Sequence, residues 1–210
     1  MTSTTSSLDD FPGTAPAPAV RPDRRWAGVA LAAAVLGFYG AATLVYERLQ
    51  LFLDAGHRTS CDINSWLSCG TVMRTPQAEA FGFPNPFIGI VAYAVVAVIA
   101  AAVLAGARFA AWYWWCVQIG VTLGWAFVLW LWWQTTFEIN ALCLYCMLVW
   151  VVQTVLFAHT TARNLEAGVL PAPAALRRAG GAWAWFASAV LLVLVFGTVF
   201  VRFAGVILPA

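Results

Sequence analysis

PFIGIVAYAVVAVIAAAVLA, residues 86–105, is a run of 20 residues without one charged side chain. A helix needs about 20 residues to cross the apolar core of a bilayer, so this run predicts a membrane-spanning helix. Similar apolar runs occupy residues 26–46, 112–134, 142–159 and 183–203. The sequence therefore predicts an all-α integral membrane protein with five transmembrane helices.

The overall composition agrees with this prediction. The chain is 62% hydrophobic and 10% charged, with a mean hydropathy of +0.81, whereas ordinary soluble domains carry about 25% charged residues. All of its basic residues are arginines, the net charge is +2, and no basic stripe is present that could neutralise phosphates. We therefore expect membrane lipid as surroundings and no nucleic acid as a partner.

The remaining segments divide the chain. Residues 1–25 are rich in Thr, Ser, Pro and Ala without an apolar period, which predicts a disordered cytoplasmic tail. Residues 26–160 form a four-span catalytic core whose one substantial loop is 47–84. Residues 161–182, with several Gly and Pro, predict a flexible cytoplasmic connection, and 183–205 predict the fifth transmembrane helix.

The first apolar run has a second interpretation, because Arg24 and Arg25 precede it and Ala41-Ala42 could form a cleavage site for a signal peptide. Signal peptides carry an apolar region of only about 7–15 residues. The greater length of this run favours a retained span.

The arginines predict the orientation. Arg21, Arg24, Arg25, Arg108, Arg163, Arg177 and Arg178 fall on one side of the five spans, and Arg48, Arg58, Arg74 and Arg202 fall on the other. By the positive-inside rule, the side with seven arginines is cytoplasmic. The protein is thus expected to be multi-pass in the inner (plasma) membrane, with a cytoplasmic N-terminus and an extracytoplasmic loop 47–84, where disulfides persist.

Cys143 and Cys146 open the fourth span as a CxxC pair. Side chains at i and i+3 of a helix lie about 5–6 Å apart between Cβ atoms, somewhat beyond the separation in a disulfide, so a small backbone adjustment would close the bond. A helix N-terminus also favours the thiolate, which is the nucleophile in disulfide exchange. The pair therefore predicts a catalytic dithiol.

Other interpretations of this pair remain open. Free cysteines are often small apolar core residues, and the cysteine count would also permit a four-thiolate zinc site. A zinc site would leave the membrane unexplained, so we expect no metal. Haem attachment is excluded because Met147 stands where a histidine is needed.

Cys61 and Cys69 bracket a short loop segment in which Asn64-Ser65 can reverse the chain. A disulfide between them is plausible, and on its own it would be a static structural bridge. The second cysteine pair on the same side favours a redox relay instead. The alternative is a non-enzymatic membrane protein with a structural loop disulfide. Cys116, within the third span, has no partner and is expected to be a packing residue.

A cofactor pocket is expected beneath the CxxC pair. Asn85 and Phe87 open the second span at the same membrane level, and Trp150 lies one turn below Cys146. Asn85 could hold a quinone carbonyl, or it could be a simple N-cap. We predict Asn85, Phe87 and Trp150 as cofactor-binding residues.

The order and spacing of these motifs resemble the vitamin K epoxide reductase family in its bacterial form. The motifs are Cys61-Asp62, Ser68-Cys69, Asn85-x-x-x-Gly89 and Cys143-x-x-Cys146. The resemblance covers about residues 26–160, and the fifth span resembles the extra helix of bacterial members. It implies a four-helix bundle around a quinone, plus one peripheral helix.

The resemblance also implies roles for single residues. Cys61 would meet the thiol of a partner, Cys69 would pass electrons to Cys143, and Cys146 would face the quinone, with menaquinone preferred to ubiquinone. Asn85 would hydrogen-bond a quinone carbonyl. The expected activity is reoxidation of a thioredoxin-like (DsbA-type) protein, supporting disulfide formation in exported proteins.

The sequence departs from the family pattern in places. Trp150 stands where vertebrate members have a tyrosine near the quinone, and Pro86 replaces a small hydroxyl residue. Many bacterial members carry a thioredoxin-like domain after the fifth span. We expect none here, and therefore a separate extracytoplasmic thioredoxin-fold partner.

Overall fold

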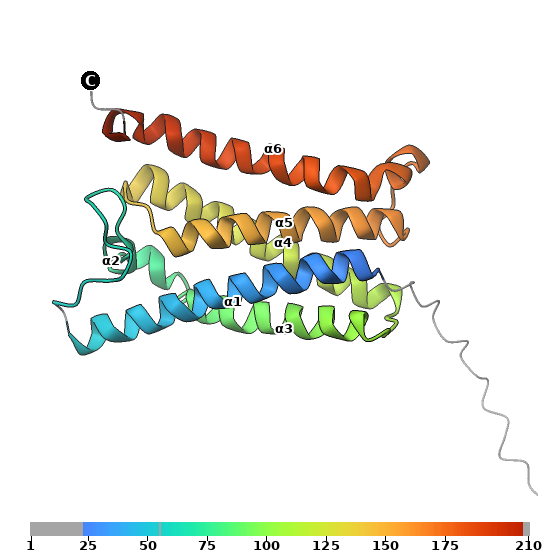
Figure 1. Ribbon diagram of the computed structural model, residues 1–210, viewed down its shortest axis with the longest axis horizontal. Coiled ribbons are helices and arrows are strands. Elements are labelled where there is room, and N and C mark those ends of the chain that lie inside the picture. Colours follow the sequence, from blue (N-terminus) through green and yellow to red (C-terminus); the bar gives the residue numbers. More distant parts are fainter. Residues whose placement is uncertain (1–22, 55, 208–210) are drawn as a thin grey trace, which may run out of the picture.

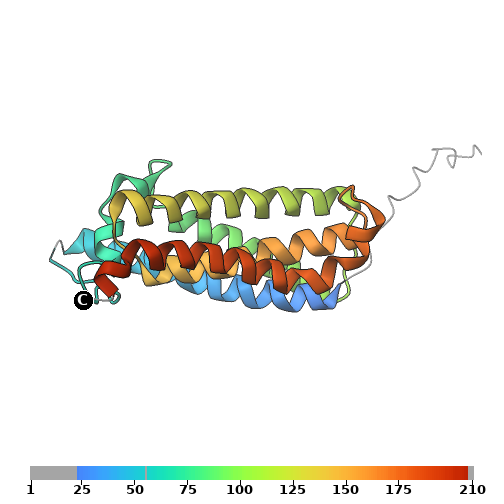
Figure 2. The ribbon, with the colours of Figure 1, turned by 90° about the horizontal axis from the view of Figure 1, so that it is seen from above.

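The computed structural model describes residues 23–54 and 56–207, so the predicted disordered tail lies almost wholly outside the described residues. Five long helices run side by side along one direction (Figures 1 and 2). They are α1 (Arg24–Leu53), α3 (Pro86–Leu104), α4 (Ala111–Trp133), α5 (Leu144–Glu166) and α6 (Ala174–Ile207). Within the described ranges, five helices are long and apolar enough to cross a membrane, which confirms the predicted all-α membrane fold.

The first four long helices form the core of the molecule. Helix α1 packs against α3 and α5, and α4 packs against α5. Helix α6 packs mainly on the outer side of α5, so it lies at the edge of the bundle (Figure 1). This arrangement is the predicted four-helix core with one peripheral helix.

Small residues let α1 approach its neighbours closely. The buried side of α1 repeats every three or four residues, at Ala27, Ala30, Ala34, Gly37, Ala41 and Leu44. A Cβ atom at Gly37 would lie only 2.5 Å from the ring of Tyr93 in α3. Small residues at helix contacts are typical of membrane bundles, because close van der Waals packing there replaces the hydrophobic effect.

The helices extend beyond the apolar runs. Helix α1 continues to Leu53, into the segment that the sequence assigned to the loop, because a helix satisfies its own backbone hydrogen bonds on either side of the membrane surface. Helix α4 continues into η2 (Gln134–Ile139), a π-helical turn. Asn140 ends this turn in the left-handed conformation with φ 57°, and its amide donates to the carbonyl of Glu138 at 3.2 Å.

The connection between α5 and α6 is shorter than expected. Helices occupy most of residues 161–182, which leaves only 167–173 between them. Gly168 takes a positive φ of 70° there. The Gly181 N–H donates to the Glu166 carboxylate, which ties the first turns of α6 to the end of α5. Gly168, Pro171 and Pro173 lie in this connection, whereas Gly180 and Gly181 lie in α6.

The large loop gathers at one end of the bundle. It contains α2 (Cys69–Met73) and the 3₁₀ helix η1 (Pro76–Glu79), and it lies at the end where α5 begins and α6 finishes (Figure 1). The described chain starts at the opposite end of the bundle (Figure 1). Helix α1 thus starts and α6 finishes at opposite ends of the bundle, as five membrane crossings require.

Candidate functional site

A turn built on Asn64 brings the first two cysteines together. Its Oδ1 accepts hydrogen bonds from the backbone N–H of Trp66 at 3.1 Å and of Leu67 at 2.8 Å. The chain reverses there, as the sequence predicted. Cys61 and Cys69 form a disulfide with their Cα atoms 5.6 Å apart.

Asp62 holds this loop together. Its carboxylate accepts from the Thr59 N–H at 2.9 Å, the Ser68 hydroxyl at 2.7 Å and the Gly70 N–H at 3.0 Å. Burial opposes ionisation, but these hydrogen bonds together hold the pKa of Asp62 below its usual value. The sequence alone predicts no separate role for Asp62. The available signal was an acidic residue inside a loop closed by two cysteines.

A backbone clamp joins the loop to the start of α5. The Leu142 N–H donates to the Trp66 carbonyl at 2.8 Å, and the Ser68 N–H donates to the Leu142 carbonyl at 2.9 Å. These bonds form an isolated parallel bridge between Leu67 and Leu142. Because Ser68 and Leu142 each precede a cysteine, the clamp sets Cys69 beside Cys143.

Cys143 stands between the two cysteine pairs. Its sulfur and those of Cys61 and Cys69 all lie within 4.8 Å of one another. The Cys146 thiol, three residues further along the chain, also interacts with Cys143. Cys143 is the N-cap residue of α5, with an extended backbone, and Cys146 lies in the first turn. Both thiols are free, and Cys143 is therefore next to the loop disulfide and to Cys146.

Both sulfurs of the disulfide are shielded from solvent. Cys61 is 1% exposed and Cys69 is 0% exposed. The segment before Cys61 is fastened to α1, because Glu47 accepts from the Ser60 N–H at 3.1 Å and pairs with His57 at 3.0 Å. Cys61 therefore lies buried next to a segment that is itself held against α1.

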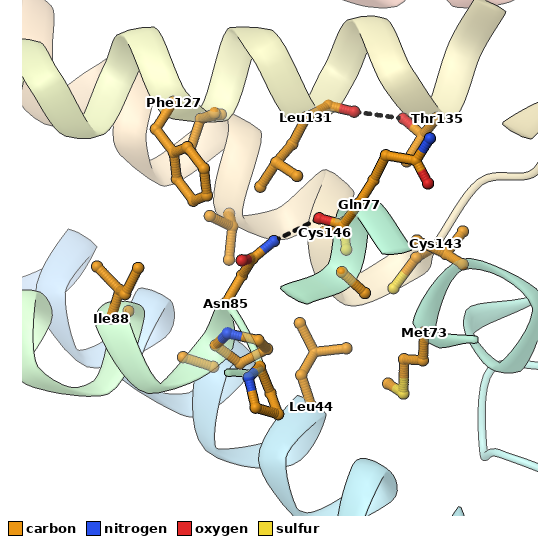
Figure 3. Close-up of a pocket in the computed structure, with 18 of the residues that line it drawn as sticks. Leu44, Met73, Gln77, Asn85, Ile88, Phe127, Leu131, Thr135, Cys143 and Cys146 are labelled. Atoms are coloured by element: carbon orange, nitrogen blue, oxygen red, sulfur yellow. Dashed lines mark hydrogen bonds between the residues drawn. The ribbon is translucent and has the colours of Figure 1, made fainter. Parts of the chain in front are cut away.

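A cavity begins at Cys143 and Cys146 and runs between α1, α3, α4 and α5. Its empty space, counted with its open mouth, is about 1160 Å³. In Figure 3, side chains of α3 and α4 surround the space beside Cys146. Its mainly apolar lining includes Leu44, Val72, Asn85, Ile88, Phe127, Val128, Leu131, Val149 and Trp150.

Two of the three predicted cofactor-binding residues, Asn85 and Trp150, line this cavity. Asn85 lines the cavity, but it makes no side-chain capping bond to α3. Its amide donates to the Gln77 carbonyl at 2.8 Å and accepts from the Ala80 N–H at 3.0 Å, which holds η1 over the cavity (Figure 3). Trp150 also lines the cavity and is 2% exposed.

Phe87 does not belong to this lining. It is 43% exposed on the outer surface of α3, because the rotation of the helix directs Asn85 and Ile88 inward instead. Cys116 is likewise exposed on α4 and is not packed in the core as expected. The structure thus brings together the cysteines of the two pairs, Asn85 and Trp150.

The donors in this cavity fit a quinone, a flat apolar ring with two carbonyl acceptors. Asn85 keeps a second amide hydrogen beyond the one given to Gln77. Arg48 lines the cavity, and its Nε is buried without a partner among the described residues. A mostly apolar cavity with a few placed donors is the usual form of a cofactor site.

Most of the four core helices and both cysteine pairs lie in a part of the chain that matches a known family. The sequence profile described as Vitamin K epoxide reductase family matches residues 29–161, more than half of the chain's 210 residues. The chain belongs to the vitamin K epoxide reductase family. A comparison with curated proteins finds no match.

The matched range of this vitamin K epoxide reductase family protein contains both cysteine pairs and the four core helices, and it ends before α6. Membership makes the chain a multi-pass membrane oxidoreductase with a redox-active cysteine pair. Members of the family use quinones and generally work with thioredoxin-like partners.

Proposed function

We propose that this protein oxidises an extracytoplasmic thioredoxin-fold protein and delivers the electrons to a quinone, which supports disulfide formation in exported proteins. The observation that carries this proposal is the position of Cys143. Its sulfur lies within 4.8 Å of both sulfurs of the loop disulfide, and it lines the same cavity as Cys146.

The first half of the relay is a thiol–disulfide exchange at the loop. A partner thiolate attacks the Cys61 sulfur, the Cys61–Cys69 bond breaks, and a mixed disulfide forms. The partner's second thiol then attacks its own sulfur in that bond and releases Cys61. The partner leaves as a disulfide, and both loop cysteines hold the electron pair as thiols.

The second half passes the electron pair to α5. The Cys69 thiolate attacks Cys143 when Cys143 and Cys146 are joined, and Cys146 leaves as a thiol. Cys61 then attacks Cys69, which restores the loop disulfide and leaves Cys143 and Cys146 reduced. The structure has this state, with a closed loop pair and two free thiols. A quinone bound in the cavity would accept two electrons and two protons from that dithiol.

The orientation and the choice of quinone stay predictions. The arginine distribution supports a plasma-membrane protein with a cytoplasmic N-terminus and both cysteine pairs outside. We retain menaquinone as the preferred quinone over ubiquinone. Side-by-side turnover of purified protein with each quinone tests this choice.

The contact between Cys69 and Cys143 can be tested directly. In a Cys61→Ser/Cys146→Ser protein, mild oxidation should join Cys69 to Cys143, because their sulfurs already lie within 4.8 Å. The matched control, Cys61→Ser/Cys143→Ser, should cross-link far less. Counting alkylated thiols by mass spectrometry measures both. Absence of the Cys69–Cys143 bond would reject the relay.

Partner entry and turnover complete the test. Cys69→Ala should trap a mixed disulfide with the thioredoxin-fold partner at Cys61, and Cys61→Ala should trap none. Cys143→Ala and Cys146→Ala should each abolish quinone reduction, whereas Cys116→Ala should not. If the loop pair instead stays oxidised while a reduced partner and quinone are supplied, the disulfide is structural and the protein is not this oxidoreductase.

A further inference from the structure

Tyr93 and Gln153 form a polar pair in the interior of the bundle, away from the cysteines. The Tyr93 hydroxyl donates to Gln153 Oε1 at 3.0 Å, and Gln153 Nε2 donates to the Val121 carbonyl at 3.0 Å. Tyr93 is 4% exposed and Gln153 is 6% exposed. Both line the cavity that contains Cys146. The pair therefore places polar atoms against an otherwise apolar part of the cavity.

The Gln153 amide has donor capacity left over. A primary amide carries two N–H groups, and Val121 is the one acceptor for Nε2 among the described residues. The Val121 carbonyl can only accept, so turning the amide over would lose its bond from Nε2. Val121 thus fixes the nitrogen of Gln153 as a donor, and the bond from Tyr93 to Oε1 holds the amide in this orientation.

The chain leaves space beside this nitrogen. A Cβ atom at Gly124 of α4 would lie 2.8 Å from Gln153 Nε2, and Gly124 itself lines the cavity. Any larger residue at this position would crowd the amide. Because Gly124 has no side chain, the Gln153 amide nitrogen stays accessible from the cavity.

The spacing along the helices matches a para-quinone. Gln153 follows Cys146 by seven residues and Tyr93 follows Asn85 by eight, which at 1.5 Å per residue places the two polar levels roughly 10–12 Å apart. A ring with a carbonyl at each end spans about 5 Å between its oxygens, and a hydrogen bond at each end adds about 3 Å. The sum, about 11 Å, is comparable with the rise along the helices between the two levels.

We propose that Gln153 binds the quinone carbonyl farther from Asn85 through its second amide N–H, and that Tyr93 acts as the positioning residue for this amide. The proposal rests on the proposed function, because it requires the quinone to occupy the cavity. The proposal gives the quinone a second hydrogen-bond donor, in a cavity that Trp150 also lines. Asn85 and Gln153 then hold the two ends of one ring.

Binding and infrared spectroscopy test this role without turnover. The full chain carrying Cys116→Ala, with both cysteine pairs oxidised so that no thiol can reduce the ring, is titrated with 2-methyl-1,4-naphthoquinone. Binding is followed by quenching of tryptophan fluorescence. The carbonyl stretching bands of the bound ring, ¹³C-labelled at one carbonyl or the other, report each hydrogen bond separately.

Gln153→Met keeps the length of the side chain and removes the amide. It should weaken quinone binding by roughly threefold to tenfold, the loss expected for one hydrogen bond, and should return one carbonyl band to its frequency in detergent micelles. Tyr93→Phe should weaken binding less and broaden the same band, because the amide then keeps only its bond to Val121 and is less firmly oriented. Asn85 variants should move the other band.

Thr154→Val is the matched control. Thr154 lies next to Gln153 on α5 and accepts a hydrogen bond from Trp125 at 3.3 Å, but it does not line the cavity. It should leave affinity and both bands unchanged. Normal binding and unchanged bands in Gln153→Met would overturn the proposal while leaving the proposed function intact. Failure of the unmodified protein to bind the quinone would overturn both.

Discussion

Asp62 is the residue on which the geometry of the redox loop depends. One carboxylate accepts hydrogen bonds from Thr59, Ser68 and Gly70, so it joins the residues before Cys61 to those around Cys69. Gly70 suits this contact, because a Cβ atom there would lie 2.9 Å from Asp62 Oδ2. The Asp62 carboxylate and the absence of a side chain at Gly70 are therefore both needed for this contact.

We predict that Asp62→Asn loosens the loop. Asparagine cannot accept all three bonds, and hydrogen bonds to a charged group are worth about 1.5–3 kcal/mol each. The Cys61–Cys69 bond should then be reduced at least tenfold faster by a water-soluble phosphine. Asp54→Asn, which changes an exposed carboxylate at the start of the same loop, is the control and should have no effect.

The same carboxylate predicts a dependence on pH. The pKa of Asp62 is lowered in the folded protein, so ionisation stabilises the loop fully above the unfolded-state pKa of about 3.9. This stabilisation is lost as the pH falls through the lowered pKa. Phosphine reduction should therefore accelerate below about pH 4 in the unmodified protein, whereas Asp62→Asn should show no such step.

Glu47 has a separate effect on access to the disulfide. It is 4% exposed and binds both His57 and Ser60, which fastens the segment that precedes Cys61. Glu47→Gln loses the acceptor for His57, so the segment should open more often. The rate at which a thioredoxin-fold dithiol reduces the loop pair should rise, by roughly tenfold for a loss of about 1.4 kcal/mol. Glu138→Gln, at an exposed position, should not change this rate.

At the scale of elements, α6 supports the loop from the side. Trp66 of the loop packs against Phe203 of α6, with ring centroids 6.0 Å apart. Trp66 also supplies a carbonyl to the clamp with Leu142. Helix α6 therefore helps to hold Cys69 next to Cys143, although it lies outside the four-helix core.

We predict that Phe203→Ala slows the formation of the Cys69–Cys143 bond in the Cys61→Ser/Cys146→Ser protein. An aromatic pair contributes about 0.5–1.5 kcal/mol beyond its buried area, which corresponds to roughly twofold to tenfold in rate. Phe200→Ala removes a ring of the same size that is 51% exposed on the same helix. Equal rates in the two variants would show that α6 does not position the loop.

Elements also show how far sequence reasoning reaches. The apolar runs located all five spans, and the Asn64 turn was predicted from residue type. The ends of the helices were not, because Glu47 and Arg48 end an apolar run while continuing α1. Two other features depend on contacts between distant parts of the chain, which no local sequence pattern contains. They are the rotation of α3 that leaves Phe87 exposed and the clamp between Leu67 and Leu142.

At the scale of the whole molecule, the loop end and the start of α1 lie at opposite ends of the bundle (Figure 1). We predict that, in a chain whose own cysteines are replaced by alanine, Ser65→Cys is labelled by a membrane-impermeant maleimide on intact cells. Arg108→Cys, between α3 and α4, should be labelled only after permeabilisation. The reverse pattern would invert the orientation predicted from the arginines.

The burial of Cys61 and Cys69 also bears on which electron donors the molecule can use. A small thiol that collides with the surface finds little of either residue exposed. If the proposed relay operates, we therefore expect small thiols to reduce the loop pair slowly. Electron flow would then depend on a protein that docks and opens the loop. Chemical selectivity among donors of similar reduction potential thus becomes a matter of molecular recognition.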